Sequence, residues 1–377
     1  MRFLKVILLV TLAATYYLLP AAFCSVTSDT VRVRILADAK TFGLKIDGRY
    51  ELKNPADKTV LYRGKDIHTT VTAHPGGIMI SGKNFPVDRL FISTKDGLIL
   101  INGRAFRGDV QIIRNSSSLM SVVNYIGLED YVKGILYHEV SHYWPMEVLK
   151  AQAIVSRSYA RYQMKENTTQ DYDLTNDVYS QVYGGSVSER QRTNRAVDLT
   201  AGKILIYGGA VMPAFFHATC GGRTEDASRL WNVNIPPLKG APCDFCREAP
   251  HFRWHEVMFT GELRQRLVNS GKSLGVIKDI RILGRDESGR ITELQVVSSN
   301  GSPVMSAKDF RNIVGPNSVR SVNFTVSIVG TDAVFEGLGW GHGVGLCQWG
   351  AYFMSKQGYS ADKILQYYYP GSDVKAR

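Results

Sequence analysis

Glu139 is the carboxylate whose place in the sequence best suits acid catalysis. Leu128, Val132 and Glu139 follow one another at helical spacing, so they share one face of a predicted helix. An ionised carboxylate on an apolar face is costly, and burial raises its pKa toward the range in which a general acid works. The alternative is that Glu139 lies at the edge of the face and pairs with a cation such as Arg157 or Arg161.

A second group of residues has the spacing of metal ligands. His217 and Cys220 form H-x-x-C, and Cys243 and Cys246 form C-x-x-C. Two such pairs are the usual layout of a structural zinc site, so these four residues are predicted to hold structural zinc. The spare ligand candidates are His251 and His255. The alternative is a disulfide between Cys243 and Cys246, with Cys220 left free.

The segment GWGHGVGLCQWGA near the C-terminus is rich in glycine and carries polar and aromatic side chains. Its glycines permit positive φ or the close approach of a ligand. His342 and Gln348 can hydrogen-bond to sugar hydroxyls, and Trp340 and Trp349 offer flat faces for sugar rings. The alternative is a tight structural turn with buried aromatics. A thiol nucleophile at Cys347 is a weaker hypothesis, because closeness to His342 in sequence says nothing about geometry.

The elements that must position these residues change type along the chain. Period-two segments between about 31 and 125 predict strands: VRVRIL, FGLKID, GIMIS, LILING, VQIIR and MSVVNYI. Two helices joined at SHYWP follow, and Pro145 is suited to open the second. The sequence therefore predicts an α+β protein with a β-rich N-terminal region, 25–120. A mixed α/β core with a substrate groove, 121–377, follows and carries a smaller inserted αβ subdomain at 254–330.

The first residues have the layout of a secretory signal. Arg2 and Lys5 precede an apolar run that ends at Pro20, and small residues follow. We predict that residues 1–24 are a signal peptide cleaved before Ser25, or an uncleaved membrane anchor. The protein is thus expected outside the cytoplasm, as a secreted, periplasmic or membrane-anchored protein, with membrane contact only through this segment.

The charge of the chain favours an anionic partner. The formal net charge is +11, and loss of Arg2 and Lys5 with the signal leaves +9. Export argues against nucleic acid and favours an anionic cell-wall polymer or a membrane surface, although charge alone also fits plain solubility. The chain lacks a dinucleotide fingerprint after a strand, which speaks against that enzyme class.

Four blocks of the sequence resemble one protein family. They are LEDYVKGILYHEVSHYWPMEVLKAQAIVSRSYARYQ, DVYSQVYGG, FFHATCGGRTEDASRLW and GWGHGVGLCQWGAYFMSKQGYSADKILQYYYPGSDV, in that order. Together they resemble the stage II sporulation protein D and LytB amidase-enhancer family over about 128–374. The stretch 254–328 matches more loosely.

The resemblance implies a role in cell-wall remodelling or sporulation, with peptidoglycan glycan strands as partner. Sporulation members are lytic transglycosylases, and the position of their catalytic acid is Glu139 here. Amidase-enhancer members imply the alternative of a non-catalytic protein that assists an N-acetylmuramoyl-L-alanine amidase. The substrate contacts we predict are Arg157, Tyr183, His342 and Gln348.

The chain departs from the family at one block. Some sporulation members carry zinc ligands in C-D-S-T-H-C-Q-V-Y, but the matching stretch from Thr175 to Tyr183 has no cysteine. The candidate ligands of this chain lie at His217, Cys220 and the C-x-x-C pair instead. A metallohydrolase that uses this cysteine cluster is a third hypothesis.

A lytic transglycosylase requires only one catalytic carboxylate. Hydrolysis of a glycoside generally uses two, and only Glu147, on the next predicted helix, is near. Attack by the sugar's own 6-hydroxyl, with Glu139 as acid and then base, would give a 1,6-anhydro product.

Overall fold

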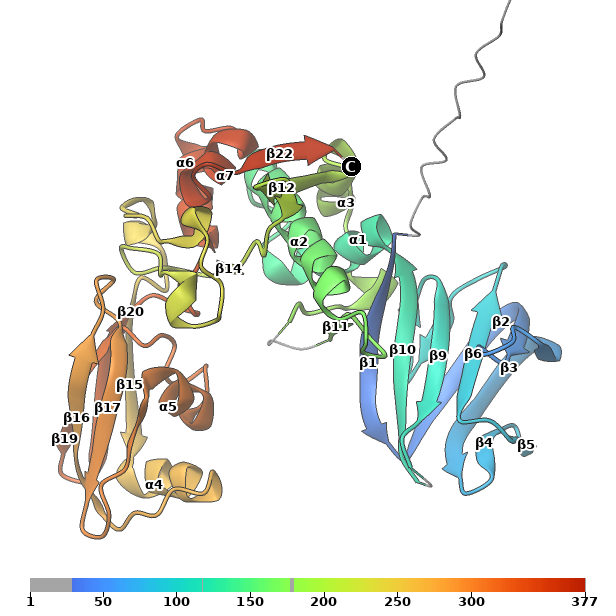
Figure 1. The fold of residues 1–377 in the computed structure, drawn as a ribbon, viewed down its shortest axis with the longest axis horizontal. Coiled ribbons are helices and arrows are strands. Elements are labelled where there is room, and N and C mark those ends of the chain that lie inside the picture. The colour runs from blue at the N-terminus through green and yellow to red at the C-terminus, as the bar shows by residue number, and fades with distance from the viewer. Residues whose placement is uncertain (1–28, 117, 177–179, 377) are drawn as a thin grey trace, which may run out of the picture.

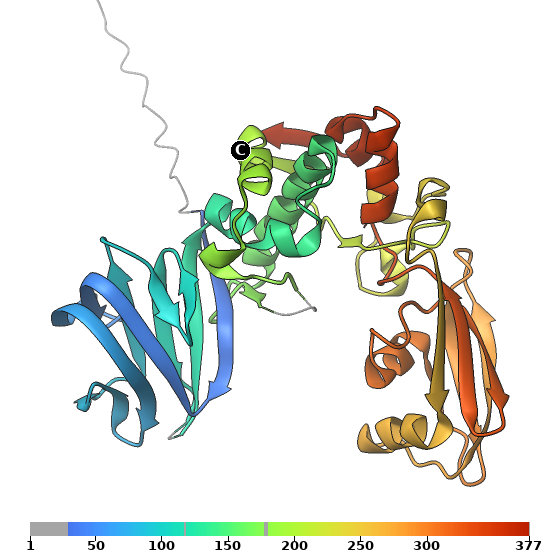
Figure 2. The same cartoon turned by 180° about the vertical axis from the view of Figure 1, so that it is seen from behind.

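The computed structural model describes residues 29–376 apart from 117 and 177–179. The predicted signal segment, 1–24, lies outside the described residues. In both views the N-terminal sheet and the inserted αβ region lie at opposite ends of an arch, with the helices between them (Figures 1 and 2). Within the described part of the chain, no helix is both long and apolar enough to cross a membrane. The predicted α+β class is confirmed.

Antiparallel strands build the N-terminal region, as their alternating sequence predicts. Their bounds are β1 Thr30–Ala39, β2 Thr41–Lys53, β3 Val60–His74, β4 Gly77–Ile80, β5 Lys83–Phe85, β6 Arg89–Thr94, β7 Ile99–Ile101, β8 Arg104–Phe106, β9 Asp109–Arg114 and β10 Met120–Gly127. The sheet order is β11-β1-β10-β9-β6-β2-β3-β4-β5, with β7 and β8 paired beside β2. Among the described strands of this sheet, β11, Leu174–Thr175, is the one that runs parallel to its neighbour, β1. Each of the six strand segments predicted from sequence overlaps one of these strands, although β7 covers only the middle of LILING and β4 ends one residue before GIMIS does.

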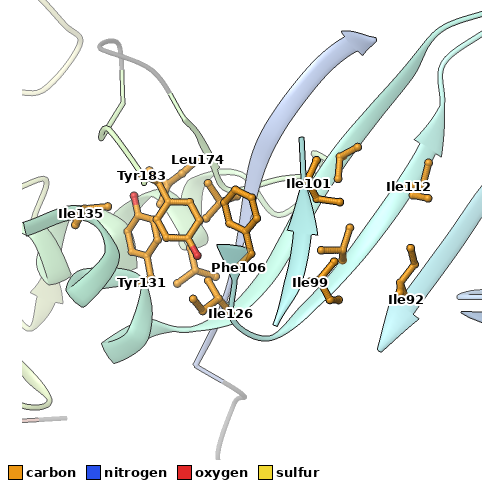
Figure 3. Close-up of a cluster of buried hydrophobic side chains, with 14 of the residues drawn as sticks. Ile92, Ile99, Ile101, Phe106, Ile112, Ile126, Tyr131, Ile135, Leu174 and Tyr183 are labelled. Carbon is orange, nitrogen blue, oxygen red and sulfur yellow. The ribbon is translucent and has the colours of Figure 1, made fainter. Parts of the chain in front are cut away.

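Helices α1, Leu128–Glu139, and α2, Met146–Glu166, follow directly. Both agree with the predicted helices, and Pro145 occupies the N-cap of α2. The next helix is α3, Gln191–Leu199. The side chains of α1 pack with the sheet into one first core, in which Tyr131 and Tyr183 lie together with Phe106 (Figure 3). The first core therefore runs from the strands into the helices without a break.

Helix α2 joins the first core to a second one. Leu149 and Ala153 pack into the first core, whereas Val148 and Ile154 pack into the second. The second core is built by short strands and two C-terminal helices: β12 Lys203–Tyr207, β13 Ala210–Val211, β14 Phe216–His217, β21 Leu346–Cys347, α6 Gln348–Lys356, α7 Ala361–Tyr368 and β22 Asp373–Ala376. One short 3-10 turn, η1 Gly185–Ser188, precedes α3, and three others follow β14: η2 Ala227–Arg229, η3 Pro236–Leu238 and η4 Phe245–Glu248.

The inserted αβ region has a third core of its own, which extends from Trp254 to Phe335. Its elements are β15 Arg253–Phe259, α4 Thr260–Asn269, β16 Ile277–Arg285, β17 Ile291–Ser298, β18 Val304–Ser306, α5 Ala307–Val314, β19 Phe324–Val329 and β20 Asp332–Leu338. Two three-stranded sheets, β15-β20-β19 and β16-β17-β18, carry the two helices. The domain boundaries and the groove given above stay predictions.

One arginine ties the inserted region to the second core. Arg290, at the turn between β16 and β17, is 1% exposed. Its guanidinium donates to the carbonyls of Cys220, at 2.7 Å, and Arg223, at 3.1 Å. It also lies 4.0 Å from the carboxylate of Glu225, which is equally buried. The two regions thus share a buried polar contact.

Candidate functional site

Glu139 is the last residue of α1. The helix ends there because Val140 adopts an extended conformation, and the chain then turns through the SHYWP elbow into α2. The side chain of Glu139 is partly buried. A carboxylate at a helix C-terminus also faces the negative end of the helix dipole, which disfavours ionisation further.

The surroundings of Glu139 favour its protonated form. Burial raises the pKa of Glu139 to about 7, and a hydrogen bond from the backbone N–H of Val182 offsets only part of that effect. Burial and the nearby Glu139 carboxylate also raise the pKa of Tyr131 well above its ordinary value. The carboxyl group is therefore half protonated near neutral pH, as a general acid requires.

The two cations considered as ion-pair partners of Glu139 are bound elsewhere. Arg157 is fully buried and makes a bidentate pair with Glu129, both N–O distances being 2.7 Å. Arg161 pairs with Asp29 at 2.6 Å. No ion pair with Glu139 is found among the residues that the structure describes.

The segment 181–188 runs along α1 and fixes the surroundings of Glu139. The hydroxyl of Tyr131 donates to Gln181 Oε1 at 3.0 Å, and both side chains are buried. The backbone N–H of Gly184 donates to the carbonyl of Gly134 at 3.1 Å. Gly134 has to be small, because a Cβ there would lie 2.5 Å from the ring of Tyr183. This contact explains how the chain approaches α1 closely enough for Val182 to reach Glu139.

Two of the predicted substrate contacts are enclosed in the fold. Tyr183 is fully buried, and its hydroxyl donates to Asn124 Oδ1 at 2.8 Å. The guanidinium of Arg157 also donates to the carbonyl of Lys203 at 3.0 Å, in addition to its pair with Glu129. Both side chains hold the elements around Glu139 together and present no free polar group to a ligand in this structure.

The elbow after Glu139 is rich in aromatic side chains. Arg192 donates to the carbonyls of His142 and Trp144, each at 2.9 Å, and so holds the elbow in place. The ring of Tyr143 is 80% exposed and lies 3.9 Å from that of His142. Trp144 packs edge-on against Trp349 of α6, with ring centroids 4.9 Å apart. The elbow therefore links Glu139 to the C-terminal block.

The glycine-rich loop packs against its own protein. Its four glycines, 339, 341, 343 and 345, have φ between +72° and +111°. At Gly343 a Cβ would lie 2.4 Å from the guanidinium of Arg290, and at Gly345 it would lie 2.0 Å from the carbonyl oxygen of Phe215. The glycines thus permit a tight internal turn, as in the alternative interpretation of this segment.

His342 lies inside that turn among aromatic rings. It contacts Trp231 with a centroid distance of 5.0 Å and His217 with one of 5.6 Å. Its Nδ1 accepts the backbone N–H of Val344 at 3.1 Å. Burial lowers the pKa of His342 well below its ordinary value, so the ring is neutral.

Gln348 begins α6 and faces α2. Its Nε2 lies 3.4 Å from Oε1 of Gln152, and its side chain is 7% exposed. Because Gln152 follows the SHYWP elbow by two turns of α2, this contact places Gln348 on the elbow side of the C-terminal block. Of the four predicted substrate contacts, His342 and Gln348 therefore lie in the glycine-rich segment and in the helix that follows it.

Four cysteines lie together, and one of them differs from the predicted ligand set. Cys220, Cys243, Cys246 and Cys347 are buried, and their sulfur atoms all lie within 4.8 Å of one another. All four are free thiols at metal-binding distance. Cys347 takes the place expected for His217.

The displacement of His217 has a simple geometric reason. His217 belongs to β14, which runs parallel to β21, and its Nδ1 lies 3.1 Å from the carbonyl of Val344. The same pairing sets Cys347 beside His217 in register. Cys220 comes after the end of β14, so the two residues of the H-x-x-C motif point to different places.

Sequence reasoning missed three residues of these sites. Tyr131 and Gln181 line the surroundings of Glu139, and Cys347 completes the thiol cluster. Cys347 carried a usable signal, because four cysteines follow the signal segment and a four-ligand site requires four. Tyr131 also carried one, since it lies eight residues before Glu139 and within the apolar stripe of the predicted helix.

Comparison with known proteins gives two family matches. A profile of stage II sporulation proteins matches residues 116–207, which include Glu139, and a profile of a domain of unknown function matches 243–345. An uncharacterized protein of Brachyspira hyodysenteriae is 32% identical over 348 residues, covering 92% of this chain and 93% of that protein.

Two further similar proteins come from Bacillus subtilis. Stage II sporulation protein D is 29% identical over 273 residues, covering 67% of this chain and 75% of that protein. An amidase enhancer is 27% identical over 288 residues, covering 64% of this chain and 40% of that protein.

Proposed function

Because this chain belongs to the stage II sporulation protein D and LytB amidase-enhancer family, we propose that it binds and cleaves the glycan strands of peptidoglycan. The reaction we propose is that of a lytic transglycosylase, with Glu139 as the acid catalyst. The cleavage would serve cell-wall remodelling or sporulation.

The observation that carries the proposal is the state of Glu139. Its pKa of about 7 results from burial, and the described residues include no ion-pair partner for it. A carboxyl group whose role is an ordinary ion pair would be held ionised by its partner. Glu139 instead keeps a proton available near neutral pH, at the end of a helix and beside an exposed aromatic elbow.

The proposed reaction uses this one carboxyl group twice. Protonated Glu139 gives its proton to the glycosidic oxygen while the bond from that oxygen to the anomeric carbon of the muramic acid breaks. The resulting carboxylate then accepts the proton of the sugar's 6-hydroxyl, whose oxygen bonds to the same carbon. The products are a 1,6-anhydro-muramyl end and a new free end, and Glu139 regains its proton. The Val182 N–H would stabilise the carboxylate between the two steps.

The nearest alternative carboxylate supports a mechanism with a single acid. Glu147 accepts hydrogen bonds from Lys150 at 2.7 Å and from the backbone N–H of Ala361 at 2.8 Å. Burial pushes the pKa of Glu147 upward, but these two hydrogen bonds bring it below its ordinary value. Glu147 thus joins α2 to the start of α7 and is not poised as a second acid or base.

Of the four predicted substrate contacts, we propose His342 and Gln348 for that role. We propose that Arg157 and Tyr183 instead position the elements around Glu139. The lactyl carboxylates of muramic acid would suit the basic surface of the chain. We further propose an extracytoplasmic location, reached through residues 1–24. Any metal ion at the four thiols would be structural, because the proposed reaction assigns no step to a metal.

The deciding experiment compares wild-type protein with Glu139→Gln on intact and on peptide-stripped glycan, with products identified by mass spectrometry. We expect anhydro-muramyl ends from the wild type and a loss of at least about a hundredfold in the variant. Gln keeps the size of the side chain and the acceptor for Val182, so the fold should remain. Absence of anhydro ends from folded wild-type protein would refute the mechanism.

The amidase enhancer among the similar proteins supports one alternative. In that reading the chain holds glycan or an N-acetylmuramoyl-L-alanine amidase without cleaving anything. Release of stem peptides by a purified amidase, measured with and without the chain, tests it. Stimulation that is equal for wild type and Glu139→Gln would favour the enhancer.

A further inference from the structure

We propose that Cys220, Cys243, Cys246 and Cys347 bind one zinc ion as four thiolates, in a closed site that joins three separate segments of the chain. The inference concerns the thiol cluster and does not depend on glycan cleavage. It also replaces His217, the ligand expected from sequence, with Cys347.

The geometry of the sulfur atoms suits a tetrahedral ion. Zinc–sulfur bonds of about 2.3 Å imply sulfur–sulfur distances of about 3.8 Å in a tetrahedron. All four sulfur atoms lie within 4.8 Å of one another, and Cys220 and Cys246 are 3.4 Å apart. A disulfide brings together only two sulfurs, whereas here each thiol is close to the other three.

The polar groups around the sulfurs are mainly donors, as thiolates require. The backbone N–H groups of Cys220 and Gly350 both donate to Cys347 Sγ at 3.3 Å, and that of Gly221 donates to Cys246 Sγ. The two carbonyl oxygens near the cluster are farther from sulfur, at 3.8 and 3.9 Å. Several buried thiolates are stable together only if a cation neutralises them.

Two features of the surrounding protein add positive potential. Cys347 is the N-cap of α6, where the helix dipole stabilises a thiolate. Arg290 donates to the carbonyl of Cys220 at 2.7 Å and is buried beside the cluster. Zinc with four thiolates carries a net charge of −2, so a buried guanidinium nearby compensates part of it.

The three segments that meet at the cluster are distant in sequence. Cys220 follows β14, Cys243 and Cys246 flank the start of η4, and Cys347 ends β21. Gly350 has to be glycine for α6 to pack here, because a Cβ would lie 2.9 Å from Cys243 Sγ. Four protein ligands leave no open position, so the ion would be structural. It would fix the start of α6, and with it Gln348.

The experiment measures metal and thiols in protein purified without chelator. We expect one zinc ion per chain by elemental mass spectrometry. We also expect all four thiols to react after denaturation with chelator but not before. Replacement by cobalt should give the absorption of a tetrahedral thiolate site. Chelation should lower the melting temperature, since metal binding is part of the folding free energy.

Variants identify the ligands. The zinc content per chain should fall at least tenfold in Cys347→Ser and in Cys220→Ser. It should stay at the wild-type level in His217→Gln and in the matched control His251→Ala. If a serine variant does not fold, the metal and thiol content of the wild type still decides. Four results would each overturn the proposal. The wild type could contain no zinc, or contain iron instead, or have a mass lower by two hydrogens because of a disulfide. The fourth is that His217→Gln loses zinc while Cys347→Ser retains it.

Discussion

Glu139→Gln should stabilise the protein at alkaline pH while it abolishes the proposed activity. In the unfolded chain the carboxyl group ionises with its ordinary pKa of 4.5, and in the folded protein burial raises that pKa to about 7. Below pH 4.5 the group is protonated in both states, so it costs nothing. As pH rises through 7, the folded protein has to ionise a group that the fold disfavours, and stability is lost.

The size of this loss follows from the difference between the two pKa values. Each tenfold change in proton affinity corresponds to about 1.4 kcal/mol, so the ionised carboxylate costs the folded state about 3 kcal/mol at pH 8. Gln cannot ionise, and its amide oxygen keeps the hydrogen bond from Val182. The variant should therefore unfold with a free energy about 3 kcal/mol higher than the wild type at pH 8 and nearly equal at pH 4.5.

Urea denaturation followed by tryptophan fluorescence at the two pH values measures this difference. Glu147→Gln is a matched control of opposite sign, because the pKa of Glu147 is lowered in the fold and its ionised form stabilises the protein. It should lose stability at pH 8. A difference between Glu139→Gln and wild type that does not change with pH would refute the view that burial tunes Glu139.

Three other predictions concern activity and packing. Glycan cleavage should fall as pH rises above about 7, because Glu139 has to start protonated; a kcat/KM profile still rising at pH 8.5 would contradict this. Glu129→Ala should lower the free energy of unfolding, measured in urea, by about 3 kcal/mol, because it leaves the buried guanidinium of Arg157 without its carboxylate. Adding Arg157→Met to that variant should restore part of the lost stability. No restoration would count against the importance of the pair. Gly350→Ala should lower the free energy of unfolding by about 1–3 kcal/mol, because the added Cβ would lie 2.0 Å from the hydroxyl of Tyr368 in α7. Gly127→Ala is the control and should have little effect, because a Cβ there meets nothing within 4 Å.

The elements were predictable where the sequence pattern is local. Alternation along β2 and the helical spacing of Val132 and Glu139 give the correct element types, because burial of one face imposes that period on the sequence. Short strands such as β14 were harder, because only two residues pair there, and the partner, β21, lies more than a hundred residues away.

The sites were predictable only in part, for the same reason. Glu139 was identified from its own helix, but the Val182 N–H that binds its carboxyl group arrives from a distant segment. The zinc hypothesis named three thiols correctly placed in the cluster, yet the H-x-x-C spacing suggested His217. Motif spacing describes which side chains can converge within one turn, and Cys347 joins the others through the pairing of two strands.

The buried contact of Arg290 limits how freely the inserted region could be removed from the protein or exchanged for another. With its own core, the stretch 254–338 has the features of a module that could be cut out or exchanged. Excision would leave the carbonyl oxygens of Cys220 and Arg223 without the Arg290 donor. It would also take Arg290 and the Ser288 hydroxyl from the buried Glu225, which would keep Arg229 at 4.0 Å. A shortened chain would therefore need new partners for all three groups. The two surfaces thus depend on each other for the partners of their buried polar groups.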